Sequence, residues 1–438
     1  MFNVGFIVPS WHYWIDPFKH QPYWELYYAT VIREAFPESD LSIDMVDLRG
    51  LPGKTLPDVV RQLPERDLYC YWIMKTGDAL EVYSIVKLLK DQYPRSKHVA
   101  GGTHVDMLPG ECAGKFDAII TGPGENSFPN IIYDVRLGAL KDVYADNYMK
   151  VPFRDTPFPR REFLPESHVV NNTLFSEDCS VLGTAVYFSR GCVYHCAFCV
   201  YNVPNMLQMR SPEMMRAELE YLKRNYQVKG VLLKDEVAIH PNSKYSKQVC
   251  DALYESGLIW RGQTTSLATF AQLTEAARSG CRELSVGVET VDEQVMKICS
   301  KEWQNEEKIR NFILSAKQTG IRVKVCLILG LPGEPPDIVE KTIKFLEDTK
   351  PEYVSISGFC PFPGSPMFKN YQYYGIKYID RNWNKYGHLL YRFADDEEVG
   401  LPFEYEEQTR WGKSFSQEEI IQNIQTIQGW ARDRGMLY

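Results

Sequence analysis

The chain has 438 residues, enough for two or three domains at about 150 residues each. It is 44% hydrophobic and 24% charged, the composition of an ordinary soluble protein with a large core. Its 49 basic and 57 acidic residues give a net charge of −8, which argues against a broad nucleic-acid footprint.

The chain also lacks the usual signs of export or membrane insertion. No apolar run approaches the roughly 18 residues of a membrane span, and the first ten residues lack the basic start of a signal peptide. We therefore expect a cytoplasmic protein. Eleven cysteines in 438 residues are too few for a disulfide scaffold, and an odd number cannot all pair within one chain. We therefore expect reduced thiols.

Short apolar runs alternate with helix-like stretches over residues 1–145. The strand-like runs are "FNVGFIVPS", "LSIDMVDL", "DLYCYWIM", "KHVAGG" and "FDAIITG". Between them, "YWELYYATVIREAF" and "DALEVYSIVKLLKDQY" have helical spacing. This alternation predicts a doubly wound, Rossmann-like parallel α/β sheet.

The remaining chain divides into three parts. Residues 146–184 are proline-rich and lose the pattern, so we interpret them as a linker. Alternation returns over 185–365, where about six βα units predict a partial, open (β/α)6 barrel rather than a full eight-unit one. Residues 366–438 form a C-terminal extension, whose last helix opens with a capping box from Ser416 to Glu419.

Three cysteines, Cys192, Cys196 and Cys199, fall in "SRGCVYHCAFC", directly after the strand-like "TAVYFSR". Structural zinc prefers four ligands in two separated pairs, and a thioredoxin-like reading of "CAFC" leaves Cys192 unexplained. In an iron–sulfur cluster with four irons, each iron requires a ligand, so three thiolates leave one iron open to another ligand. The spacing therefore predicts an iron–sulfur cluster, with His195 as a bystander. An electron carrier or sensor is disfavoured, because simple carriers use four protein ligands.

With this C-x3-C-x2-C spacing after its first strand, the 185–365 region resembles the radical S-adenosylmethionine (SAM) superfamily. The resemblance implies a [4Fe–4S] cluster on the three cysteines, whose open iron binds SAM. One electron from the cluster would then cleave SAM and produce a 5′-deoxyadenosyl radical.

The resemblance also implies SAM-binding residues at the carboxyl ends of the barrel strands. Polar groups at such ends converge on one mouth, which supports a functional role over that of helix caps or salt-bridge partners. The residues are Phe198 and Gly330 near the adenine, Asp235 or Glu236 at the methionyl amino group, and Glu289 at the ribose.

Two glycine-rich stretches, "VAGGTHVDMLPGE" and "IITGPGENSF", follow strands of the first sheet. Together they resemble the cobalamin-binding domain of the B12-dependent radical SAM class, in which such turns pass close to the corrin. The DxHxxG motif that supplies a histidine to cobalt elsewhere is absent, so we expect no histidine ligand. The residues assigned to cobalamin are Trp72, Thr76, Gly101, Gly102, Thr103, His104, Gly122, Gly124 and Glu125.

The commonest reaction of this class is C-methylation of an unactivated carbon, with the methyl group passing from SAM through methylcobalamin. The two modules have no long extra domain between or after them. In this respect the chain resembles the enzyme that methylates a glutamine of methyl-coenzyme M reductase. We therefore expect a peptide, protein or small-molecule substrate, a one-electron reductant and a monomer without nucleic-acid or membrane partners. The alternative is a B12-domain radical SAM oxidoreductase or cyclase that rearranges a small metabolite.

The C-terminal extension is dense in aromatic residues, and its role is open. Its side chains could line a channel for a peptide substrate, or form a surface layer that closes the open side of the barrel. The residues are Tyr371, Tyr373, Tyr374, Tyr378, Trp383, Tyr386 and Tyr391.

Overall fold

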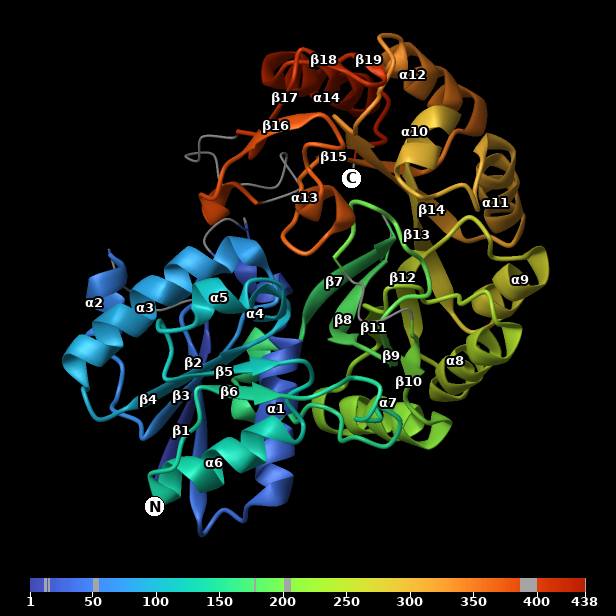
Figure 1. Cartoon of the computed structure of the whole chain (residues 1–438). Coiled ribbons are helices and arrows are strands. Elements are labelled where there is room, and N and C mark those ends of the chain that lie inside the picture. Colours follow the sequence, from blue (N-terminus) through green and yellow to red (C-terminus); the bar gives the residue numbers. More distant parts are fainter. Residues whose placement is uncertain are drawn as a thin grey trace. The chain divides into compact units, whose positions relative to one another are not determined.

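The computed structural model describes residues 1–11, 14, 16–49, 55–176, 179–200, 206–386 and 400–437. These residues form two compact units (Figure 1). The first contains Met1–Val169 together with Asn382–Asn384. The second contains Val170–Arg381 and, of the remaining described residues, 385–386 and 400–437.

The first unit is built on a six-stranded sheet with the order β2-β1-β3-β4-β5-β6. Each neighbouring pair of its strands is parallel. The strands are β1 (Phe2–Val8), β2 (Leu41–Asp47), β3 (Leu68–Trp72), β4 (Lys97–Gly101), β5 (Ala118–Thr121) and β6 (Val143–Ala145). All five residues of β3 are buried, as expected of a parallel strand covered on both faces.

The strand order of this sheet reverses at β1, which lies between β2 and β3. Of the helices that cover the sheet, α1 (Tyr23–Ala35) packs beside α6 (Ser127–Leu137), and α2 (Leu56–Val60) beside α3 (Ala79–Gln92). Ligands of open α/β sheets bind beyond the carboxyl ends of the strands at such a reversal. The predicted doubly wound sheet is confirmed.

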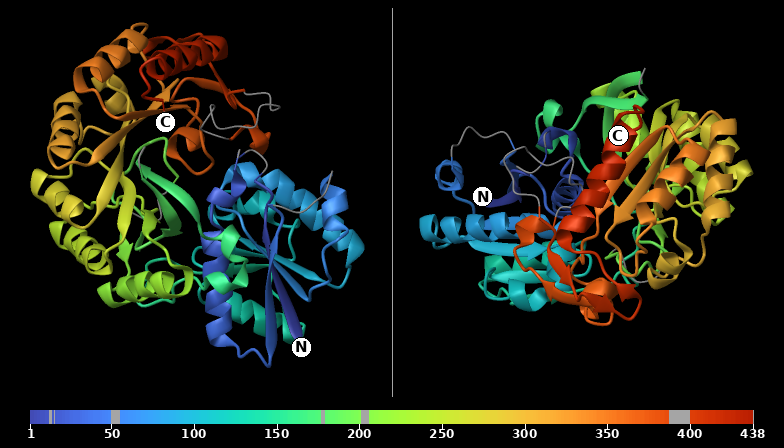
Figure 2. Two further views of the ribbon diagram at one scale, coloured as in Figure 1. Left: turned by 180° about the vertical axis from the view of Figure 1, so that it is seen from behind. Right: turned by 90° about the horizontal axis from the view of Figure 1, so that it is seen from above.

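The second unit contains a seven-stranded sheet with the order β15-β14-β13-β12-β11-β8-β7. Its strands are β7 (Asn171–Ser176), β8 (Cys179–Val186), β11 (Gly230–Leu233), β12 (Ile259–Thr264), β13 (Cys281–Glu289), β14 (Arg322–Leu329) and β15 (Tyr353–Gly358). All neighbours are parallel except β7 and β8. The sheet curls, with helices on its outer face, so the predicted partial barrel of six βα units is confirmed (Figure 2).

The barrel helices lie between successive parallel strands. They are α7 (Pro212–Tyr226), α8 (Ser243–Ser256), α9 (Phe270–Arg278), α10 (Glu293–Ile298), α11 (Glu306–Gln318) and α12 (Ile338–Thr349). Side chains cap most of their starts; for example, the Ser211 side chain accepts a hydrogen bond from the backbone N–H of Met214.

The start of the barrel differs from the sequence-based expectation. Strand β8 begins inside the segment interpreted as a linker, and β7 pairs with it as an antiparallel hairpin arm. The ring of Phe175 in β7 is fully buried, and an added Cβ at Gly230 would lie 2.6 Å from it. The polar "NNT" start of β7 hid this strand from a search for apolar runs.

The C-terminal region adds α13 (Pro366–Lys369), two small antiparallel sheets and α14 (Gln417–Arg432). The capping box from Ser416 to Glu419 is confirmed, and α14 packs on β15 and α12. The two-stranded sheets are β16 (Ile376–Ile379) with β17 (Phe403–Tyr405), and β18 (Gln408–Thr409) with β19 (Gly412–Lys413).

The aromatic residues of this region do not form one lining or one layer. Tyr373 and Tyr378 are 57% and 51% exposed, whereas Trp383 is buried within the first unit. Trp383 therefore fits neither of the two alternatives that the sequence left open for this region, a channel lining or a surface layer. Tyr391 lies outside the described residues.

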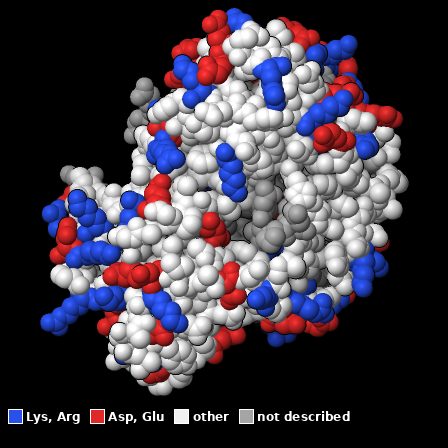
Figure 3. Space-filling model, viewed as in Figure 1, with Lys and Arg blue, Asp and Glu red and all other residues white. Residues whose placement is uncertain are grey.

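The surface carries both signs of charge. On the face in Figure 3, Lys and Arg side chains are interspersed with Asp and Glu side chains. Within the described part of the chain, no helix has the length and apolar character required to cross a membrane.

Candidate active site

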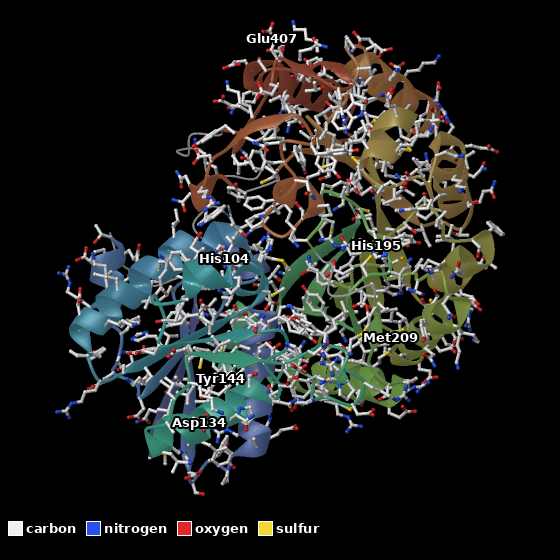
Figure 4. The ribbon with its side chains drawn as sticks, viewed as in Figure 1. His104, Asp134, Tyr144, His195, Met209 and Glu407 are labelled. Carbon is white, nitrogen blue, oxygen red and sulfur yellow. The ribbon has the colours of Figure 1, made fainter. Side chains whose placement is uncertain are left out.

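The three-cysteine loop starts at the end of β9 (Ser189–Arg190), which pairs with β10 (Gln208–Met209). Gly191 turns the chain with a φ of +87°, a conformation that favours glycine. Cys192, Cys196 and Cys199 are each partly exposed and form no disulfide. His195 is exposed on the same loop (Figure 4).

Backbone and ring contacts hold this loop on two sides. The Ala197 N–H donates to the Cys299 carbonyl at 2.9 Å, and the Ala197 carbonyl accepts from the Met367 N–H at 2.9 Å. The Tyr194 ring stacks on Trp303 with centroids 4.3 Å apart. The loop that carries the thiols is therefore held by segments more than a hundred residues further along the chain.

The donor set fits an iron–sulfur cluster. Among the described residues, no three His, Cys, Asp and Glu side chains are gathered so that they could hold one metal ion. A cube of four irons does not require such convergence, because each thiolate binds its own corner. Burial raises the pKa of the Cys192 thiol, and that of Cys196 to about 11, so thiolate formation here depends on a bound cation.

The two carboxyls that follow β11 have different surroundings. Asp235 is 2% exposed and accepts hydrogen bonds from the Phe188 N–H at 2.8 Å and the Ser189 hydroxyl at 2.7 Å. It therefore anchors the chain just before the cysteine loop. Burial raises the pKa of Asp235 to about 7 and that of Glu236 to about 8, where the charge of Asp235 adds to the effect.

Glu289 ends β13 in a left-handed conformation, with a φ of +65°. Lys301 Nζ lies 3.3 Å from its carboxylate and donates to the Gly287 carbonyl at 2.8 Å. An added Cβ at Gly287 would lie 2.5 Å from Glu289 Oε1, so glycine makes room for this carboxylate. The Lys301 side chain is 3% exposed, and its charge offsets part of the increase that burial causes in the thiol pKa of Cys192 and Cys196.

Sequence reasoning missed Lys301. The residue lies in the short connection after α10, where a lysine has no distinguishing pattern. Only the fold brings it beside the end of β13.

Gly330 turns the chain after β14, with a φ of +84°. Its N–H donates to Glu334 Oε2 at 2.9 Å, and its carbonyl accepts from the Tyr405 hydroxyl at 2.8 Å. An added Cβ would lie 2.8 Å from Ile420 of α14. Two residues of the C-terminal region, Tyr405 and Ile420, therefore pack against this turn. Phe198, which was also predicted near the adenine, is partly exposed beside Cys199.

In the first unit, the glycine turn after β4 is a place of close backbone approach. An added Cβ at Gly101 would lie 2.4 Å from the Trp72 ring, and one at Gly102 would lie 2.7 Å from the Ile73 carbonyl oxygen. Gly102 also has a φ of +100°. The loops after β3 and β4 therefore lie together at the carboxyl edge of the sheet.

The turn after β5 is equally tight. Gly122 has a φ of +85°, and its N–H donates to Asp106 Oδ1 at 2.7 Å. An added Cβ at Gly124 would lie 2.8 Å from the Tyr28 ring. Glu125 accepts a hydrogen bond from the Tyr27 hydroxyl at 2.8 Å.

His104 is part of a buried hydrogen-bond network. The residue is 1% exposed; its Nε2 lies 2.8 Å from the Tyr83 hydroxyl and its Nδ1 lies 3.3 Å from Thr76 Oγ1. Burial lowers the pKa of His104 to about 4, which keeps the ring neutral at pH 7. Both ring nitrogens are engaged within the protein, in line with the expectation of no histidine ligand to cobalt. Thr103 donates to Met74 Sδ at 3.7 Å.

Comparisons with known proteins agree with this architecture. Residues 186–346 match the family model of the Radical SAM superfamily. The chain is 25% identical over 387 residues to an uncharacterized methyltransferase, PH0819, of Pyrococcus horikoshii, covering 82% of this chain and 80% of the relative. It is 24% identical over 303 residues to the bacteriochlorophyllide d C-12(1)-methyltransferase of Chlorobaculum tepidum, covering 67% and 63%.

A different chemistry occurs among the more partial matches. The anaerobic magnesium-protoporphyrin IX monomethyl ester cyclase of Rubrivivax gelatinosus is 27% identical over 188 residues, 42% of this chain and 34% of the relative. Among solved structures, the fold is similar to the radical SAM methyltransferase TsrM of Kitasatospora setae with cobalamin and a [4Fe–4S] cluster bound. That match has a TM-score of 0.64 and 14% identity, over 86% of this chain and 79% of TsrM.

Proposed function

The chain belongs to the radical SAM superfamily, and we propose that it is a cobalamin-dependent C-methyltransferase. The observation that carries the proposal is the pairing of two carboxyl-edge sites in one chain. One has three cysteines that form no disulfide, in a loop after the first strand of a partial barrel. The other has two tight glycine turns on a doubly wound sheet.

The cofactors are a [4Fe–4S] cluster, SAM and cobalamin. The superfamily match and the cobalamin-containing structure of similar fold support all three. When bound, the cluster supplies the electron that cleaves SAM and cobalamin supplies the methyl group. The remaining task of the protein is to hold the reacting groups in place and to exclude water.

In the second unit we assign the cluster to Cys192, Cys196 and Cys199. Asp235 and Glu236 were alternatives for the methionyl amino group. We assign this role to Glu236, because Asp235 already accepts two hydrogen bonds from the start of the loop. Glu289 is assigned to the ribose, with Lys301 fixing its carboxylate. Phe198 and the Gly330 turn are assigned to the adenine.

In the first unit we assign cobalamin to the carboxyl edge formed after β3, β4 and β5. Only backbone can approach a ligand closely at tight turns of this kind. His104 acts through the network that holds Thr76. The assigned residues are Trp72, Thr76, Gly101, Gly102, Thr103, His104, Gly122, Gly124 and Glu125.

For the substrate, we propose a peptide or protein side chain such as the glutamine of methyl-coenzyme M reductase. One of the relatives acts on a bacteriochlorophyllide, so a tetrapyrrole is the competing substrate class. The partial match to a cyclase favours, as a second function, a rearrangement without methyl transfer. A one-electron reductant, a monomeric state and a cytoplasmic location remain predictions.

One experiment separates these outcomes. The reconstituted enzyme is reduced and incubated with SAM that carries a deuterated methyl group, together with a glutamine peptide or a bacteriochlorophyllide. Methylation replaces one substrate hydrogen with a labelled methyl group, and one SAM becomes S-adenosylhomocysteine while a second becomes 5′-deoxyadenosine and methionine. An altered but unlabelled product supports the cyclase alternative. If SAM is never cleaved with either substrate, the proposal is wrong.

A further inference from the structure

A short segment of the C-terminal region belongs to the first unit. Residues 382–384 cluster with Met1–Val169, although the residues on both sides of them belong to the second unit. The side chain at the centre of this segment is Trp383, which is 2% exposed. An indole that is buried in one unit while its chain neighbours belong to the other has a packing or positioning role that the proposed chemistry does not account for.

Trp383 contacts the network around His104. Its Nε1 donates to Glu111 Oε1 at 2.7 Å, a bond between residues 272 positions apart in the chain. Its ring meets the His104 ring edge-on, with centroids 5.9 Å apart at 75°. The Trp383 carbonyl oxygen lies 3.8 Å from the position of a Cβ at Gly77, in the loop after β3.

The hydrogen bonds of this network run in one direction. Tyr83 has a single hydroxyl proton, which it donates to Glu111 Oε1 at 3.0 Å. His104 Nε2 must then carry a proton and donate it to the Tyr83 oxygen. In a neutral ring this leaves Nδ1 as an acceptor for the Thr76 hydroxyl. Glu111 therefore ends the chain of donors and receives Trp383 as its second donor.

We propose that Trp383 is a positioning residue for the cobalamin-binding edge of the first unit. It fixes Glu111, and through Tyr83 and His104 it fixes Thr76 in the loop after β3. The inference rests on the proposed function, because Thr76 and His104 are among the residues assigned to cobalamin. The C-terminal region thus completes a site whose other residues lie in the first 169 positions.

The test uses the full-length, cluster-loaded protein and three variants. Trp383→Phe keeps an aromatic ring but removes the N–H donor, and Glu111→Ala removes its acceptor. Trp430→Phe is the matched control, since Trp430 is a partly exposed residue of α14. Cobalamin affinity is read from the visible spectrum, and hydrogen–deuterium exchange is followed over residues 76–83 and 103–112.

We expect Trp383→Phe to weaken cobalamin binding by about tenfold, the scale of one hydrogen bond to a charged group. Exchange should rise in both segments, and Trp430→Phe should change neither readout. In the Glu111→Ala background, Trp383→Phe should have little further effect, because its action passes through Glu111. A general loss of packing would instead give additive losses.

The outcomes distinguish the inference from the proposed function. Unchanged affinity and exchange in Trp383→Phe, or effects that add in the double variant, would overturn the positioning role. A wild-type protein that binds no cobalamin would refute the proposed function. In that case the exchange data still decide whether Trp383 holds the two segments.

Discussion

In both units the candidate site lies at the carboxyl edge of a parallel sheet, but the residues at the two edges are of different kinds. In the second unit, side chains supply the chemistry: thiols, carboxyls and a buried lysine surround the start of the barrel. In the first unit, the notable feature is the absence of side chains at three glycines: Gly102 and Gly122 pack against backbone, and Gly101 packs against the Trp72 ring.

This difference decides how each edge responds to substitution. A site made of functional groups loses its ligand when one group is removed, while the fold persists. A site made of close backbone contacts loses its shape when an atom is added. The variants below test this contrast, from the largest expected effect to the smallest.

A single substitution among the three cluster cysteines should abolish the activity of the second unit. Cys192→Ser, Cys196→Ser or Cys199→Ser removes one of three ligands, so we expect no SAM cleavage to 5′-deoxyadenosine after reconstitution. Cobalamin bound to the first unit should keep its visible spectrum. Cys179→Ser is the control, since this partly exposed cysteine lies outside the loop. Cluster content and SAM cleavage equal to wild type in any loop variant would contradict the assignment.

A methyl group added at a close-packed glycine of the first unit should destabilise that unit. Gly102→Ala places a Cβ 2.7 Å from the Ile73 oxygen, at a φ of +100°. We expect a loss of roughly 1–3 kcal/mol in the stability of the first unit, and weaker cobalamin binding. Urea denaturation and spectral titration measure the two effects.

The matched control for this change is Gly110→Ala. Gly110 has no heavy atom within 4 Å of an added Cβ and no positive φ, so alanine should be tolerated there. Equal stability losses at both positions would mean that close approach is not the reason for Gly102.

Asp235 and Glu236 should separate loop anchoring from SAM binding. Glu236→Gln should weaken SAM binding by about tenfold, since the positive charge of a bound amino group favours the ionised form of Glu236 despite its raised pKa, and glutamine cannot form that charge-assisted hydrogen bond. Asp235→Asn should lower the amount of cluster loaded, because two buried donors share its carboxylate. Iron analysis and equilibrium binding of SAM distinguish the two. If Asp235→Asn weakened SAM binding and Glu236→Gln lowered the amount of cluster loaded, the two assigned roles would have to be exchanged.

The smallest effect at pH 7 concerns acid stability, because it develops only as the pH falls below 6.5. The pKa of His104 is about 4 in the folded protein, below its usual value near 6.5. Its contribution to stability is therefore complete above pH 6.5 and is lost as the pH falls from 6.5 to 4, by at most about 1.4 kcal/mol per pH unit. His104→Asn should reduce the pH dependence of urea denaturation over this range, and the pH dependence that remains includes the contribution of His98, whose pKa burial also lowers to about 4.

The sequence predicted the parts of the molecule that depend on local pattern. Buried parallel strands such as β3 are continuous apolar runs, and three cysteines in eight residues have few explanations. The missed strands lacked such a signal: β7 starts with polar residues, and β6 has three residues. Lys301 and Trp383 were unpredictable in principle, because their roles arise from contacts with distant segments.

The place of Trp383 bears on how this protein can be divided and rebuilt. A gene fragment that stops at Val169 encodes all six strands of the first sheet but lacks the indole donor to Glu111. Such a fragment would carry an opening where residues 382–384 belong. Exchanging cobalamin modules between related enzymes by a single crossover therefore separates Glu111 from its partner. A transplant that also carries the short segment around Trp383, or supplies it in trans as a peptide, would keep the module whole.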